Sequence, residues 1–131
     1  MIIKTEDIKK WIIPDKLPYS SELFDITTLG GYSNYTEYLY DKKNIVMMTP
    51  KEYFERTAEG FGITPNQNID EIGKHKDILN HLHDVIFIAK KKLPLCYVSA
   101  SNGSKQEGRH RMYFAASLFG WNKSFPVLLV P

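Results

Sequence analysis

The chain has 131 residues, of which 43% are hydrophobic and 24% charged, and these ordinary globular values predict a single domain over residues 1–131. The lone cysteine, Cys96, excludes an internal disulfide and a cysteine-based zinc site, and its apolar surroundings predict a buried structural thiol. No apolar stretch approaches the roughly 20 residues of a membrane span. The N-terminus contains acids and lacks a signal-peptide pattern, so we expect no membrane association and a cytoplasmic location.

The charges are distributed unevenly along the chain. Residues 1–89 carry ten Lys and Arg against fourteen Asp and Glu, whereas residues 90–131 carry seven against one. The net charge of +2 therefore divides into −4 and +6. A basic C-terminal third is typical either of a solvated surface or of a site for an anion or nucleic acid, and charge alone does not separate these alternatives.

Residues 1–44 are predicted to form a peripheral layer that is partly helical and rich in tyrosine. A helix is expected over 5–13 and a second, shorter one over 20–31, where two glycines end the pattern. The tyrosines of residues 32–44 are expected to cover the core with their rings. The alternative is a surface that stacks nucleic-acid bases or contacts a protein partner.

The pattern becomes clearer from Asn44 onward. A short β-rich run leads to a helix over 50–59, which Thr49 caps and Glu52 supports through a capping box. Residues 63–68 are expected to form a loop. The spacing of apolar residues then predicts one continuous helix over 70–92, with His75 at the edge of the core.

The last third predicts a strand, a hairpin, a helix and a final strand. The strands are expected over 95–100 and 125–130, and Asn-Gly at 102–103 predicts the hairpin turn between the first strand and a short return. The helix is expected over 109–119. Together the elements predict an α+β fold, in which a small mixed β-sheet with packed helices forms a core over residues 45–131.

The segment KQEGRHRM, residues 105–112, places basic side chains where the last helix begins. A helix N-terminus carries partial positive charge and disfavours cations. One interpretation is that Gly108, the free first-turn amides and the two arginines bind phosphate. The other is that Glu107 pairs with Arg111, four residues further on, in an ordinary salt bridge.

This segment resembles the signature of the ParB/sulfiredoxin-like superfamily. The resemblance rests on the segments EGRHR (107–111), AA (115–116), LFG (118–120) and PV (126–127), and it covers about residues 69–131. Within it, GRHR is most similar to the phage-type "ParB-like nuclease" domains. The resemblance implies the fold of that superfamily and a loop that binds the phosphates of ATP or CTP, with Mg²⁺ as an accompanying ion. It also implies activities such as nucleotide hydrolysis, phosphoryl transfer or DNA cleavage.

The motif and this resemblance together predict six site residues. Those predicted for phosphate or nucleotide binding are Gln106, Gly108, Arg109 and Arg111, and those predicted for catalysis, as groups that handle protons in phosphoryl transfer, are Glu107 and His110. No metal site is predicted, because the histidines lack ligand spacing.

The chain also departs from the superfamily pattern. Arg109 stands where sulfiredoxins carry their catalytic cysteine, so sulfinic-acid reduction is not expected. The sequence ends directly after the final strand, so DNA segregation by further domains is not expected. A second acid is not identified, and Glu52 and Glu55 qualify only if their helix faces the motif. The alternative function is a catalytically silent phage- or plasmid-type module that engages DNA or a host protein.

Overall fold

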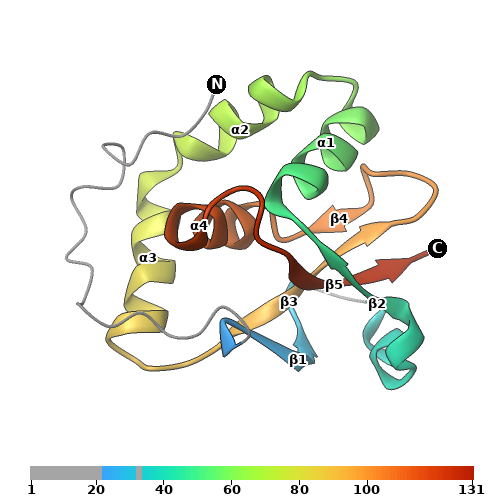
Figure 1. Cartoon of the computed structure of the whole chain (residues 1–131), viewed down its shortest axis with the longest axis horizontal. Helices are drawn as coiled ribbons and strands as arrows, with labels where there is room; N and C mark the ends of the chain where they lie inside the picture. The colour runs from blue at the N-terminus through green and yellow to red at the C-terminus, as the bar shows by residue number, and fades with distance from the viewer. Residues whose placement is uncertain (1–21, 32–33) are drawn as a thin grey trace.

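The computed structural model describes residues 22–31 and 34–131, which form an α+β fold (Figure 1). Within these ranges a mixed five-stranded sheet packs against four α-helices, so the predicted fold class is confirmed. The helix predicted over 5–13 lies outside the described residues. No helix within the described ranges is long and apolar enough to cross a membrane.

The sheet is built around two parallel central strands. Its strands are β1 (Phe24–Leu29), β2 (Ile45–Met48), β3 (Leu93–Ser99), β4 (Gln106–Glu107) and β5 (Phe125–Val130). β3 and β5 pair in parallel and are almost continuously buried, as expected for central strands. β1 lies parallel to β3, β2 antiparallel to β5, and β4 antiparallel to β3. The predicted final strand and the hairpin after β3 are therefore confirmed.

The last helix is enclosed by the other three (Figure 1). The helices are α1 (Pro50–Phe61), α2 (Pro65–Gly73), α3 (Lys76–Phe87) and α4 (Arg109–Phe119). The run from Met112 to Ala116 is buried without interruption, so α4 is apolar around most of its circumference and not along one stripe alone. The helix that begins at the motif is thus anchored in the centre of the fold.

The capping signals locate α1 as predicted. The Thr49 hydroxyl accepts a hydrogen bond from the Glu52 amide at 3.1 Å, and the Glu52 carboxylate accepts one from the Thr49 amide at 3.4 Å. The helix ends at Gly62, whose φ of +70° suits a left-handed C-cap. Both halves of the predicted capping box are therefore confirmed.

The loop predicted over 63–68 and the single helix predicted over 70–92 are both wrong. Thr64 caps α2 and forms a second capping box with Gln67, so a helix begins where a loop was expected. α2 ends at Gly73, and α3 begins after His75. A Cβ on Gly73 would lie 2.8 Å from the Tyr113 hydroxyl, so the glycine allows the end of α2 to approach α4 closely.

The short helix predicted over 20–31 is also wrong, because this segment contains the edge strand β1. The β-branched run Ile26, Thr27 and Thr28 favours an extended backbone. The following Gly30 donates its amide hydrogen to the Leu95 carbonyl at 3.1 Å. Gly30 thus brings the chain close to β3 instead of ending a helix.

Two tyrosines of the segment after β1 cover the core, as predicted. Tyr35 and Tyr38 are partly buried and pack against the core, and the Tyr35 ring lies 5.1 Å from that of Tyr97. Tyr40 differs, since 85% of its surface is exposed at the end of the 3-10 helix Thr36–Tyr40. The covering role therefore holds for Tyr35 and Tyr38 and not for Tyr40, whereas Tyr32 lies outside the described residues.

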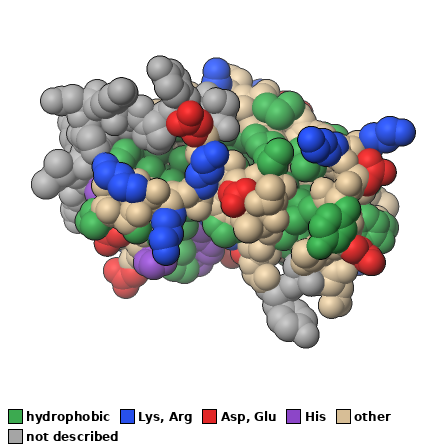
Figure 2. All heavy atoms as spheres, turned by 90° about the horizontal axis from the view of Figure 1, so that it is seen from below, with side chains coloured by type: hydrophobic (Ala, Val, Ile, Leu, Met, Phe, Trp, Pro, Cys, Tyr) green, Lys and Arg blue, Asp and Glu red, His purple; other side chains and the backbone are tan. Residues whose placement is uncertain are grey.

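Figure 2 shows how charge is distributed on one face of the molecule. Lys and Arg side chains of the described residues are spread across this face, with Asp and Glu side chains and hydrophobic groups between them. The charge asymmetry along the sequence therefore does not become one continuous basic surface here.

The contact between α1 and the β3–β4 loop gives a stability prediction. A Cβ on Gly60 would lie 2.0 Å from the Ser104 amide nitrogen. Gly-to-Ala within a helix usually stabilises by about 0.5–1 kcal/mol, but here we expect Gly60→Ala to destabilise by about 1–3 kcal/mol through overpacking. Urea unfolding measures this change. The neighbouring exposed-site variant Glu59→Ala should stay within about 0.5 kcal/mol of the wild type, and a stabilised Gly60→Ala would contradict the contact.

Candidate functional site

The β3–β4 hairpin carries the motif to the start of α4. Gln106 pairs with Val98 and Glu107 with Tyr97 across the hairpin. The Tyr53 hydroxyl lies 3.0 Å from the Tyr97 carbonyl oxygen and 3.3 Å from Gln106 Oε1. Gln106 is therefore turned toward the buried face of α1.

Gly108 fixes where α4 begins. Its φ is +129°, and a Cβ there would lie 2.4 Å from Cys96 Sγ, so a larger residue meets both backbone strain and a clash. Cys96 Sγ in turn donates to the Gly108 carbonyl oxygen at 3.4 Å. Burial raises the pKa of Cys96 to about 11, which keeps it a neutral thiol at pH 7. The predicted structural role of this cysteine is confirmed.

Arg111 is engaged within the fold. Its guanidinium donates to both oxygens of Glu107, with Nη1 to Oε1 at 3.1 Å, and Nη2 also donates to the Leu95 carbonyl at 3.2 Å. A Cβ on Gly30 would lie 2.2 Å from Nη2, so the guanidinium rests on the backbone after β1. The salt bridge proposed as the alternative to a phosphate contact is therefore present in the structure.

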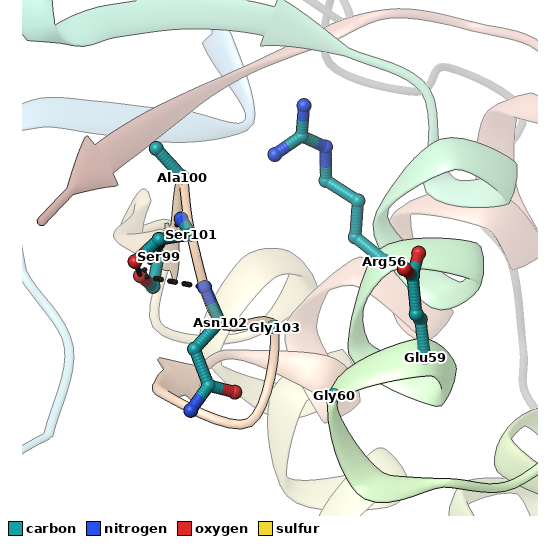
Figure 3. Close-up of a pocket in the computed structure, with 8 residues that line it drawn as sticks. All are labelled: Arg56, Glu59, Gly60, Ser99, Ala100, Ser101, Asn102 and Gly103. Atoms are coloured by element: carbon teal, nitrogen blue, oxygen red, sulfur yellow. Dashed lines mark hydrogen bonds between the residues drawn. The ribbon is translucent and has the colours of Figure 1, made fainter.

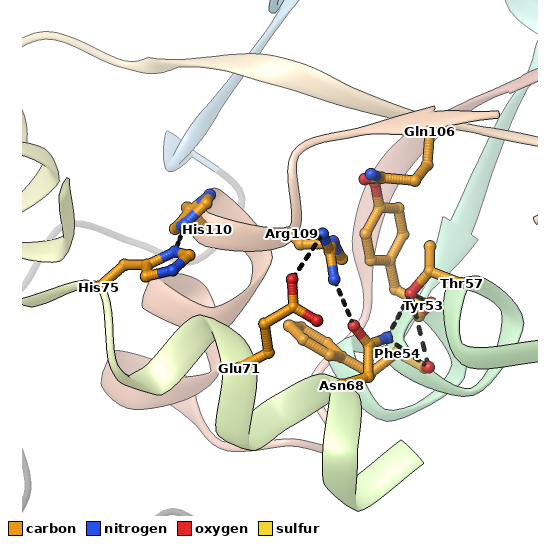
Figure 4. Close-up of polar contacts among 9 residues, drawn as sticks. All are labelled: Tyr53, Phe54, Thr57, Asn68, Glu71, His75, Gln106, Arg109 and His110. Carbon is orange, nitrogen blue, oxygen red and sulfur yellow. Dashed lines mark hydrogen bonds and ion pairs between the residues drawn. The ribbon is translucent and has the colours of Figure 1, made fainter. Parts of the chain in front are cut away.

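Arg109 lies against α1 and α2 instead of against its own hairpin (Figure 4). Its Nη1 donates to Asn68 Oδ1 at 2.7 Å, and its Nη2 lies 3.5 Å from Glu71 Oε1. The guanidinium carbon is 4.6 Å from the centroid of the Phe61 ring, which is within the range of a cation–π contact. These three neighbouring groups thus hold the guanidinium of Arg109 against α1 and α2.

His110 meets the start of α3. Its Nε2 lies 2.7 Å from His75 Nδ1, and the two rings are stacked with centroids 5.0 Å apart (Figure 4). His75 is the N-cap residue of α3 and is exposed, so its predicted place at the core edge is wrong. Burial, then His75 and Arg109, lower the pKa of His110 below its usual value. His110 is therefore neutral at pH 7.

The start of α4 has no side-chain cap. α1 and α2 both begin with capping boxes, whereas Gly108 at the N-cap of α4 has no side chain to accept the first-turn amide hydrogens. These donors lie beside Arg109 and His110. Amide hydrogens, the positive end of the helix dipole and a guanidinium together favour an anion.

The carboxylates beside the motif are Glu107 and Glu71. Each lies next to an arginine, Glu107 beside Arg111 and Glu71 beside Arg109. The two acids considered on α1 are engaged elsewhere: Glu52 caps its helix, and Glu55 pairs with Lys51 at 3.9 Å. Among the described residues no group of three or more His, Cys, Asp or Glu is placed to hold a metal ion.

Sequence reasoning missed the contribution of α2. Asn68 and Glu71 lie three residues apart on one face of this helix, and both reach Arg109. The sequence signal for α2 is Thr64 followed by Pro65 and, three residues after the threonine, Gln67. This order repeats the capping box at the start of α1. With α2 assigned, a polar residue on its buried face would have stood out.

Two hollows of the described residues lie away from the motif. One, of about 450 Å³, lies between the exposed side of α1 and the β3–β4 loop and is lined by Arg56, Glu59, Gly60 and residues 99–103 (Figure 3). The other, of about 510 Å³, is lined by Trp121 and by residues of α1 and α2. Neither lining includes residues 106–111, so the motif offers a surface for a ligand group and not one of these hollows.

No protein-family model, curated protein or solved structure matches the chain. The ParB/sulfiredoxin-like resemblance and the roles that it implies therefore stay predictions.

The lowered pKa of His110 predicts a pH dependence of stability. Because the folded state favours the neutral ring, the unfolded state binds more protons between the folded pKa and the unfolded value of about 6.5. This contribution to the free energy of unfolding is fully present above pH 6.5 and is lost as the pH falls toward the folded pKa. Urea unfolding at pH values from 7.5 to 5 should therefore show that the free energy of unfolding falls less steeply in His110→Gln than in the wild type.

His81→Gln is the matched control, since His81 is an exposed histidine on α3. This control should keep the wild-type pH slope. If His110→Gln also keeps that slope, the ring is not held in its neutral form by the fold.

Proposed function

We propose that this chain binds the phosphate groups of a nucleotide, ATP or CTP, or of nucleic acid at the start of α4. The observation that carries the proposal is the meeting of three features at one place: an uncapped helix N-terminus at Gly108, the guanidinium of Arg109 and the ring of His110. A phosphate supplies the negative charge that cations at a helix N-terminus require. The basic motif then no longer opposes the helix dipole.

In this proposal the two arginines have different roles. Both Nη atoms of Arg111 already donate within the fold, Nη1 to Glu107 and Nη2 to Glu107 and the Leu95 carbonyl. Arg111 and Glu107 therefore support the shape of the loop, with Gln106 held from α1. Arg109 presents its charge at the site, and its contact with the half-exposed Glu71 is the longer one at 3.5 Å. Arg109 is thus the better candidate for direct contact with phosphate.

The same site suits phosphoryl-transfer chemistry. Such reactions depend on charge neutralisation and on a group that accepts a proton near pH 7. Arg109 supplies the charge, and the neutral ring of His110 is able to accept a proton. A phosphotransferase, nucleotidase or nuclease activity fits these features. Mg²⁺ would enter with the nucleotide, since no three-ligand metal group is present in the described part of the chain.

The second candidate is a binding module without turnover. Both carboxylates at the motif, Glu71 and Glu107, are paired with arginines, which leaves no free acid beside the site in the described residues. Such a module would engage DNA or a host protein in the cytoplasm. Tyr40, with 85% of its surface exposed, offers one ring of the Tyr-rich segment to a protein partner.

Ligand binding separates these proposals from a purely structural motif. Thermal shift and titration calorimetry with ATP, CTP, GTP and a DNA oligonucleotide, each with and without Mg²⁺, should show a raised melting temperature for the wild type. Arg109→Gln should weaken binding by about tenfold or more, because it removes a charge-assisted contact. Arg56→Gln is the matched control, since Arg56 is exposed with no partner among the described residues, and it should bind as the wild type does.

Three outcomes decide between the alternatives. Equal binding by the wild type and Arg109→Gln, or no binding of any ligand, contradicts the phosphate site. Loss of binding in Arg111→Met without loss of folding assigns the contact to Arg111 instead. If binding occurs, release of phosphate from labelled nucleotide or cleavage of the oligonucleotide identifies an enzyme, and its absence identifies a binding module.

A further inference from the structure

Asn68 is a buried polar residue whose orientation is determined by α1. None of its surface is exposed, and its Nδ2 donates to the Phe54 carbonyl at 3.0 Å and to Thr57 Oγ1 at 2.7 Å. Thr57 Oγ1 uses its own hydrogen on the Tyr53 carbonyl at 2.9 Å, so it accepts from Asn68. A carbonyl oxygen only accepts, so the amide nitrogen must face α1 and the amide oxygen must face the motif.

This orientation aims the amide oxygen at Arg109. Asn68 Oδ1 accepts from Arg109 Nη1 at 2.7 Å (Figure 4). The Phe61 ring packs against the same guanidinium at 4.6 Å. Only 16% of the Arg109 side chain is exposed. The long arginine side chain is therefore ordered in the folded protein before any ligand arrives, and less conformational entropy is lost on binding.

Glu71 occupies the remaining edge of the same guanidinium. Its Oε1 lies 3.5 Å from Arg109 Nη2, and 51% of the Glu71 side chain is exposed. A long contact made by an exposed carboxylate contributes little and is readily exchanged for another anion. The Glu107–Arg111 pair differs, because its two hydrogen bonds are shorter and its arginine is also bound to the Leu95 carbonyl.

We propose that Asn68 is the positioning residue that holds Arg109 toward its ligand, and that Glu71 is an internal competitor which a ligand phosphate displaces from Nη2. This inference rests on the proposed function and specifies how that site is tuned. It takes a phosphate oxygen as the group that replaces the Glu71 carboxylate. Two neighbouring residues on α2 then act on the same arginine in opposite directions.

Substitutions of the two residues should change the affinity in opposite directions. Titration calorimetry on the full-length protein, with ATP or CTP as the probe, measures these changes. Glu71→Gln removes the competing charge and should tighten binding by about two- to fivefold. Glu55→Gln is the matched control: it removes an equal charge from an exposed helical carboxylate whose partner is Lys51 and not Arg109. The gain in affinity must be larger for Glu71→Gln than for Glu55→Gln. This difference in affinity should become smaller at high salt, because salt screens the ion pair that the ligand displaces.

Asn68→Asp tests the positioning role. It places a carboxylate on Arg109 and removes both donors to α1, so we expect binding weakened by about fivefold or more in a protein whose melting is checked in parallel. Thr57→Val is the gentler variant. It removes the hydroxyl that accepts from Asn68, leaves every partner of Arg109 in place, and should weaken binding by about twofold.

The outcomes separate this inference from the proposal on which it rests. If the wild type binds neither nucleotide, the phosphate site fails and the inference fails with it. If the wild type binds and Arg109→Gln does not, but Glu71→Gln equals Glu55→Gln, the site stands and the competitor role is overturned. Wild-type affinity in folded Asn68→Asp or in Thr57→Val overturns the positioning role. Since Glu71 is exposed, its comparison remains decisive even where Asn68→Asp does not fold.

Discussion

The close contact between Gly108 and Cys96 is the constraint on which the motif depends. Because a Cβ at Gly108 would lie 2.4 Å from Cys96 Sγ, the backbone at the start of α4 is pressed directly onto the central strand β3. The buried run from Met112 to Ala116 holds the rest of the helix in place. The backbone from which the three basic side chains extend is therefore held in place by the core.

From this origin the three side chains diverge to three different elements. Arg111 turns toward β1 and β3 and pairs with Glu107, Arg109 extends to α1 and α2, and His110 stacks on the start of α3. The electrostatic cost of placing cations at a helix N-terminus is thus divided among separate neighbours. Arg111 is bound closely by Glu107 and the Leu95 carbonyl, whereas the carboxylate partner of Arg109 is the more distant Glu71. This difference is the basis of the proposed function.

The sequence allowed prediction wherever local signals agreed. Thr49, Pro50 and Glu52 predicted α1, and Gly108 predicted the start of α4, because capping and backbone conformation are decided by neighbouring residues. The capping pattern at Thr64 and Gln67 marks α2, but the apolar spacing continues across the break at Gly73 and favours one longer helix. The partners of Arg109 lie about forty positions away along the chain, and the fold that joins them depends on long-range packing that local patterns do not encode.

The contact between His75 and His110 couples the chemical states of two rings on different helices. At 2.7 Å the inner nitrogens, Nδ1 of His75 and Nε2 of His110, have room for one hydrogen between them. The tautomer of one neutral ring therefore dictates that of the other. The starts of α3 and α4 are thus linked through a single hydrogen shared by two rings, and a change in the hydrogen bonding of one ring reaches the other helix.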